Sequence, residues 1–189
     1  MNKSVSVAPM MDCTDKHDRY FLRLISKNVL LYTEMIVANA IIRGDKDLLL
    51  KFNLLEKPLA LQIGGSVPKE LAEAVRIAEN YGYDEINLNL GCPSKKVQKN
   101  KFGACLMKEP NLVGDCISAM KNACRLPITA KTRIGFGFTS IKHPLKSNIQ
   151  FFITCRIPIS LDITFKPPLS SIFLKITKNK LKWIELSKK

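Results

Sequence analysis

Short runs of apolar residues alternate with longer amphipathic stretches along residues 1–135. Each short run is apolar at consecutive positions, so that both faces of the strand it predicts would be covered, as in a sheet flanked by helices. The alternation predicts βα units and a parallel sheet, which is an α/β fold. Five strands are expected, over residues 5–9, 30–34, 59–63, 85–89 and 128–131.

Helical periodicity fills three of the intervals between these strands. Residues 69–80 carry apolar side chains at i, i+3, i+4 and i+7, with a proline at their start and a glycine just beyond their end. Residues 15–26 and 111–124 have similar spacing, and both are predicted to be helices that lead to the next strand. The apolar positions of the first helix are Tyr20, Phe21, Leu24 and Ile25.

The composition changes abruptly after Gly135. Residues 136–189 contain no alanine, one glycine and nine isoleucines, whereas residues 1–135 contain eleven alanines and eight glycines. Apolar runs at 149–154 and 157–165 could be strands, but proline and charged residues interrupt the second run and no βα rhythm continues. No domain is assigned to this tail.

The net charge of +14 favours a polyanionic partner. Residues 1–135 carry a net charge of +6 and residues 136–189 a net charge of +8, so the tail is the more basic part. No apolar run approaches the roughly 18–20 residues of a membrane span. The six cysteines form no CxxC pair, and no signal peptide is recognised, so we expect no metal site, no disulfide framework and a cytoplasmic location.

Candidate site residues follow the predicted strands, where parallel α/β proteins collect their chemistry. Lys131 would face a solvent-filled mouth or an anionic ligand, although a solvated lysine at a strand end is the simpler interpretation. Gln62 can donate and accept hydrogen bonds at once, which suits the edge of a flavin or a base and equally a structural amide.

Cys92 is the strongest catalytic candidate. Gly91 and Pro93 predict a tight turn around it, at the mouth of the sheet rather than on a core face. A loop thiol can also be inert, and no histidine follows nearby to activate a nucleophile. An ordinary thiol is protonated at pH 7, so the chemistry that fits this position is general acid catalysis.

Several ordered segments resemble the tRNA-dihydrouridine synthase family, most closely its A subgroup. The run INLNLGCP at 86–93, followed by Val97 and by Gly103-Ala104, is similar to the family's NxGCP motif in order and spacing. Further similar blocks are VAPMMDCTDKHDRYFLRLIS, LYTEM, LQIGGS, FGACLM and TAKTRIG. The resemblance extends from residue 5 to about residue 135.

The resemblance implies a TIM (β/α)8 barrel with FMN as cofactor, NADPH as reductant and a D-loop uridine of tRNA, at position 20 or 20a, as substrate. It further implies that reduced FMN passes hydride to C6 of the uracil while Cys92 protonates C5. Asn89 would contact the uridine or the flavin. The residues implied to hold the flavin are Pro9, Met10, Met11, Gln62 and Lys131.

The chain departs from the family pattern in its first block and after residue 135. Cys13 stands where the family has tryptophan, and Asp18 where it has cysteine. Residues 1–135 are thus expected to form a partial barrel of about five βα units with an open sheet edge. The composition of 136–189 is typical of an AT-rich gene translated out of frame, so a frameshift or gene remnant is one hypothesis.

Two other functions stay open at this point. The chain could be a non-catalytic fragment whose basic tail binds RNA phosphates without reading sequence, or an inactive gene remnant. Another FMN-dependent barrel oxidoreductase could act on a free pyrimidine, although the NxGCP-like block disfavours that hypothesis.

Overall fold

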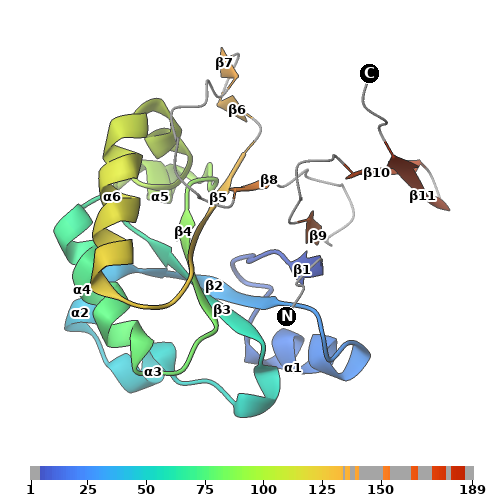
Figure 1. Cartoon of the computed structure of the whole chain (residues 1–189), viewed down its shortest axis with the longest axis horizontal. Coiled ribbons are helices and arrows are strands. Elements are labelled where there is room, and N and C mark those ends of the chain that lie inside the picture. The colour runs from blue at the N-terminus through green and yellow to red at the C-terminus, as the bar shows by residue number, and fades with distance from the viewer. Residues whose placement is uncertain are drawn as a thin grey trace.

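The computed structural model describes residues 5–133 in full and, beyond them, the backbone of six short strands (Figure 1). The strands beyond residue 133 are β6 Gly135–Phe136, β7 Thr139–Ser140, β8 Phe151–Ile153, β9 Ile163–Phe165, β10 Ile172–Thr177 and β11 Lys180–Glu185.

All five predicted strands are present. Strands β2, β3, β4 and β5 are parallel neighbours in that order, and an isolated parallel bridge between Ser6 and Leu30 places β1 beside the start of β2. The prediction of an α/β fold with a parallel sheet is therefore confirmed. The strand bounds are β1 Val5–Val7, β2 Leu31–Val37, β3 Leu59–Gly64, β4 Glu85–Asn89 and β5 Ile128–Thr132.

The helices between these strands include the three that periodicity predicted. Of these, α4 buries the four apolar positions expected of it, Leu71, Ala74, Val75 and Ala78. The remaining helices are too short for periodicity to reveal. The helices are α1 Lys16–Ile25, α2 Ala38–Arg43, α3 Lys46–Leu50, α4 Pro68–Glu79, α5 Lys95–Lys99 and α6 Pro110–Ala123, with 3-10 helices η1 Leu54–Glu56 and η2 Gly103–Lys108.

The two faces of the sheet differ in polarity. Helices α2, α4 and α6 cover one side (Figure 1), and there Leu61, Ile63 and Leu88 are fully buried in the main apolar core. The other face of β3 and β4 carries Gln62 and Asn87, which are also buried. A half-covered sheet would expose this second face to water, whereas a closing barrel encloses it. The polar face is therefore the interior of a partial barrel.

Two tail strands join the edges of this sheet. Strand β8 pairs with β5 in parallel, and β9 pairs with both β8 and β1 in antiparallel. The sequence predicted a partial barrel with an open sheet edge, and the described strands correct this expectation, because the unpaired backbone groups of an edge strand accept a partner. The antiparallel β9 differs from the all-parallel strands of a (β/α)8 barrel, so the fold is a partial barrel.

Helix α1 is formed as predicted, but its four apolar positions face outward. Tyr20 is 48% exposed, and Leu24 is 68% exposed. The buried face instead carries Arg19 and Arg23, each less than a tenth exposed. Apolar periodicity therefore located the helix without identifying the face that packs against the sheet.

The two arginines replace apolar packing by hydrogen bonding beneath α1. The Nε of Arg19 lies 2.6 Å from Oε2 of Glu56 in η1, whose side chain is 3% exposed. The guanidinium of Arg23 donates to the carbonyl oxygens of Ser26, Val29, Glu56 and Pro58 at 2.9–3.0 Å. These charges are buried at acceptable cost because each is paired or hydrogen-bonded.

Candidate functional site

The candidate site lies at the carboxyl ends of the parallel strands. Register pairs Gln62 on β3 with Asn87 on β4, and Asn89 on β4 with Lys131 on β5. Side chains at these positions point to the same face, because strand residues two apart share a face. The sheet therefore gathers Gln62, Asn89 and Lys131 inside the partial barrel.

A chain of side-chain amides links the strands across this face. Asn89 donates through Nδ2 to Oε1 of Gln62 at 2.9 Å, and Gln62 donates through Nε2 to Oδ1 of Asn87 at 2.8 Å. Asn87 in turn donates to the hydroxyl of Thr129 at 2.8 Å. Because each amide both donates and accepts, the orientation of every member is fixed by its neighbours.

This series of hydrogen-bonded side chains ends at a buried carboxylate, which lies at the opposite end of the strands. Oε1 of Glu85 accepts hydrogen bonds from the hydroxyls of Thr129 and Tyr32, each at 2.7 Å. Burial, followed by the nearby Glu85 charge, raises the pKa of Tyr32, so its hydroxyl stays protonated and keeps donating.

Sequence reasoning missed the inner members of this network. The available signal was the alternation Glu85, Asn87, Asn89 with Ile86 and Leu88 between them, which marks one polar and one apolar face of a strand. The run was interpreted as apolar on both faces.

Cys92 sits in a turn that Asn89 holds. The Oδ1 of Asn89 accepts hydrogen bonds from the backbone N–H groups of Gly91 at 3.1 Å and of Cys92 at 3.0 Å. The carbonyl of Cys92 accepts from the N–H of Ala104 at 3.0 Å, which ties the turn to η2. The backbone of Cys92 is thus held by hydrogen bonds, while the residue is only half-buried.

The other cysteines of residues 5–133 differ from Cys92 in placement. Cys116 is buried on α6, and that burial, together with the nearby Asp115 charge, raises the pKa of its thiol to about 11. Cys105 donates through its thiol to the carbonyl of Phe102 at 3.1 Å. Cys92 alone among them lies directly after the polar end of a central strand.

The segment after β1 forms a separate turn. Thr14 closes it, because its hydroxyl accepts from the N–H of Met10 at 3.0 Å and its own N–H donates to the Met10 carbonyl at 3.0 Å. Asp12 donates through its N–H to Glu34 at 2.6 Å. Met11 is 51% exposed and Pro9 is half-buried. Hydrogen bonds thus join Gln62, Asn89 and Cys92 into one group, while residues 9–11 occupy their own turn.

Gly103 provides a test of how tightly the Cys92 turn is held. Gly103 has a φ of +73°, and an added Cβ would lie 2.5 Å from Cγ1 of Val97 and 2.8 Å from the Cys92 carbonyl oxygen. We expect Gly103→Ala to destabilise the fold by about 2–5 kcal/mol, combining left-handed strain and overlap. Gly82→Ala is the matched control, because Gly82 has a φ of +82° but open space around it. Urea unfolding measures the stability of both variants, and equal losses of stability would contradict the close packing at Cys92.

Comparison with known proteins assigns the chain to a family. The family model described as dihydrouridine synthase matches residues 6–146, which is most of the chain. The protein is a member of the dihydrouridine synthase family. Enzymes of this family use a flavin, and their fold is the TIM barrel of which this chain forms a part.

Curated relatives support the same assignment. The tRNA-dihydrouridine(20/20a) synthase of Synechocystis sp. is 60% identical over 131 residues, which is 69% of this chain and 39% of the relative. The proteins of that name from Vibrio parahaemolyticus and Pseudomonas aeruginosa are 59% and 55% identical over 69% and 71% of this chain. The chain spans 39–41% of the length of these relatives.

The described residues lack two other kinds of feature. No group of three His, Cys, Asp or Glu side chains within them is placed to hold a metal ion. Their helices are also too short or too polar to cross a membrane.

Proposed function

We propose that this chain reduces a D-loop uridine of tRNA, at position 20 or 20a, to 5,6-dihydrouridine, with FMN as cofactor and NADPH as reductant. The observation that carries the proposal is the position of Asn89 at the carboxyl end of β4. Asn89 accepts a hydrogen bond from the N–H of Cys92 and donates one to Gln62, and so links the two residues. The predicted cytoplasmic location agrees with a tRNA substrate and stays a prediction.

The polar face of the partial barrel fits the pyrimidine edge of a flavin. That edge presents carbonyl oxygens and ring nitrogens, which need donors together with an acceptor. The Gln62 amide donates one N–H to Asn87 and accepts one hydrogen bond from Asn89, which leaves its second N–H and its second lone pair for a flavin. Lys131, in register with Asn89, adds a cationic donor. We further propose that the backbone of Pro9, Met10 and Met11 contacts the ring system. When bound, the flavin supplies the hydride that adds to C6 of the uracil.

Cys92 is proposed to complete the reduction at C5. Its thiol gives a proton to C5, so the C5–C6 double bond becomes a single bond with one hydrogen added at each carbon. The resulting thiolate regains a proton from solvent, which its half-buried position permits. The uracil must first swing out of the tRNA stack to reach this turn. Asn89 positions the thiol through the Cys92 N–H and is also proposed to contact the uridine or the flavin.

Asn89→Ala tests this positioning role. The substitution removes the acceptor of two backbone N–H groups and the donor to Gln62, so we expect a loss of about 2–4 kcal/mol of stability and a fall in activity. Asn89→Asp keeps the acceptor oxygens and should restore the turn but not the donation to Gln62. Unfolding curves and dihydrouridine assays measure the two effects. Full activity in Asn89→Ala would contradict the role.

The proposed function is tested by following NADPH oxidation in the presence of the chain and FMN. We expect oxidation that depends on a tRNA transcript with an unmodified D-loop, and none above background with free uracil or orotate. Turnover of the free pyrimidines alone would instead favour another barrel oxidoreductase. Binding of tRNA without NADPH oxidation, unchanged in Cys92→Ser, would favour a non-catalytic RNA-binding fragment.

A further inference from the structure

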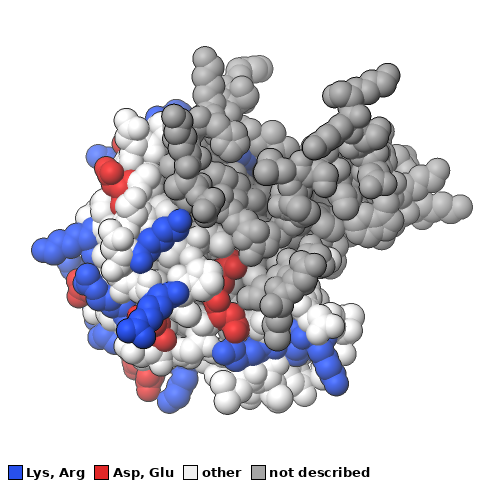
Figure 2. Space-filling model, viewed as in Figure 1, with Lys and Arg blue, Asp and Glu red and all other residues white. Residues whose placement is uncertain are grey.

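The positive charge of the first 135 residues is concentrated in one segment. Residues 86–108 contain five lysines and no acidic residue, whereas the rest of residues 1–135 carries 15 basic and 14 acidic side chains. Figure 2 shows basic and acidic side chains interspersed over the described surface of its view. The segment with unbalanced charge is the one that contains Cys92.

This segment is fixed relative to Cys92. Helix α5 begins three residues after the cysteine, and its N-cap Ser94 accepts a hydrogen bond from the N–H of Val97 at 3.3 Å. Val97 is 7% exposed, and its buried side chain anchors the helix to the core. Lys101 then turns the chain back with a φ of +57°. The position of α5 is therefore fixed relative to the Cys92 turn, at the carboxyl ends of β4 and β5 (Figure 1).

Four lysines of this segment lie on its surface without neutralising partners. Lys95, Lys96, Lys99 and Lys101 are all exposed. Within residues 5–133 the ion pairs join Arg19 to Glu56, Lys51 to Asp47 and Lys57 to Asp84, and none involves these four lysines. Four unpaired ammonium groups on one short helix and its turn repel one another unless an anion lies between them.

We infer that Lys95, Lys96, Lys99 and Lys101 bind the phosphodiester backbone of the RNA that presents its base to Cys92. This inference rests on the proposed function and names the binding surface it requires. A flipped base remains joined to phosphates on both sides, which must lie near the thiol when the base does. Ammonium groups bind these phosphates without reading sequence, so the lysines fix position, and the pocket selects the base.

The test compares two quadruple variants with the same change of charge. One replaces Lys95, Lys96, Lys99 and Lys101 with glutamine. The control replaces four exposed lysines on segments leading back to strand starts, namely Lys27, Lys46, Lys51 and Lys121. Binding of unmodified tRNA transcript to each full-length chain is measured across a series of salt concentrations, after matching thermal unfolding midpoints confirm that both variants fold.

The α5 variant is expected to bind tRNA at least tenfold more weakly at about 0.1 M salt. The slope of log affinity against log salt should fall by about 1 for each lysine that contacts a phosphate, and by much less in the control. Equal losses of tRNA affinity in the two variants would overturn the assignment of these lysines to phosphate binding and leave the proposed function standing. Failure of the unaltered chain to bind tRNA would overturn both.

Discussion

Cys92→Ser is expected to lower the rate of dihydrouridine formation by about 10²- to 10⁴-fold, the usual contribution of a positioned general acid. A serine hydroxyl is a far weaker acid than a thiol but nearly the same size. The hydrogen bonds from Gly91 and Cys92 to Asn89 are donated by backbone N–H groups, so the substitution leaves them intact. The loss should therefore fall on the chemical step, with little change in tRNA affinity.

Cys105→Ser is the matched control for this substitution. Cys105 lies in the same connection and is also half-buried, but its thiol donates to the Phe102 carbonyl. A serine hydroxyl can make the same donation, so activity should stay within about twofold of the unaltered chain. Nucleoside analysis of the reacted tRNA measures both variants. Activity retained in Cys92→Ser, or lost equally in both, would contradict the assigned role.

Arg19→Met is expected to destabilise the fold by about 3–5 kcal/mol, because it leaves the buried Glu56 carboxylate without its cationic partner. The guanidinium also donates to the Thr14 carbonyl at 2.6 Å, and Thr14 closes the turn that contains Met10. The loss should therefore extend from α1 to the end of β1. Chemical unfolding followed by circular dichroism measures it.

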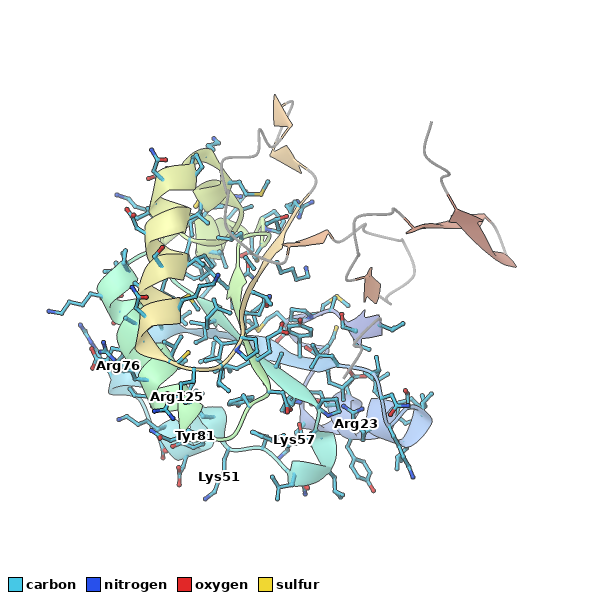
Figure 3. The ribbon with its side chains drawn as sticks, in the orientation of Figure 1. Arg23, Lys51, Lys57, Arg76, Tyr81 and Arg125 are labelled. Carbon is cyan, nitrogen blue, oxygen red and sulfur yellow. The ribbon has the colours of Figure 1, made fainter. Side chains whose placement is uncertain are left out.

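Lys51→Met is the control for the loss of a lone ion pair. The Lys51–Asp47 pair spans 3.3 Å, but its side chains are 74% and 65% exposed. Figure 3 places Lys51 at the outer edge of the molecule, whereas Arg23, the other buried arginine, belongs to α1. Water screens an exposed pair, so a loss below about 1 kcal/mol is expected. Similar losses at Arg19 and Lys51 would contradict a buried network beneath α1.

Burial of polar residues is where sequence-based prediction of the fold failed. Short apolar-rich runs located all five strands, and the spacing in residues 69–80 located α4, because apolar side chains of these elements are buried in the core. The same reasoning gave α1 its position but not its buried face. Arg19 and Arg23 can be buried only because Glu56 and distant carbonyl groups meet them, and such partners depend on tertiary structure.

The candidate site, like the fold, was predicted where local sequence was enough and missed where contacts between distant residues decide. Gln62 and Cys92 were predicted individually from the strand ends, and Asn89 was implied by the family resemblance; the structure joins the three by hydrogen bonds. The support from Asn87, Thr129 and Glu85 was missed, since cross-strand hydrogen bonds depend on register. The roles of Pro9, Met10, Met11 and Lys131 toward a flavin stay predictions.

The most direct measurement is the mass of the D-loop fragment of a tRNA transcript after incubation with this chain, FMN and NADPH. A gain of two hydrogens on a uridine at position 20 or 20a is expected, and no gain when Cys92→Ser replaces the unaltered chain. An unchanged mass with folded, flavin-bound protein would contradict the proposed activity. A gain of the same size in Cys92→Ser would contradict the role of the thiol.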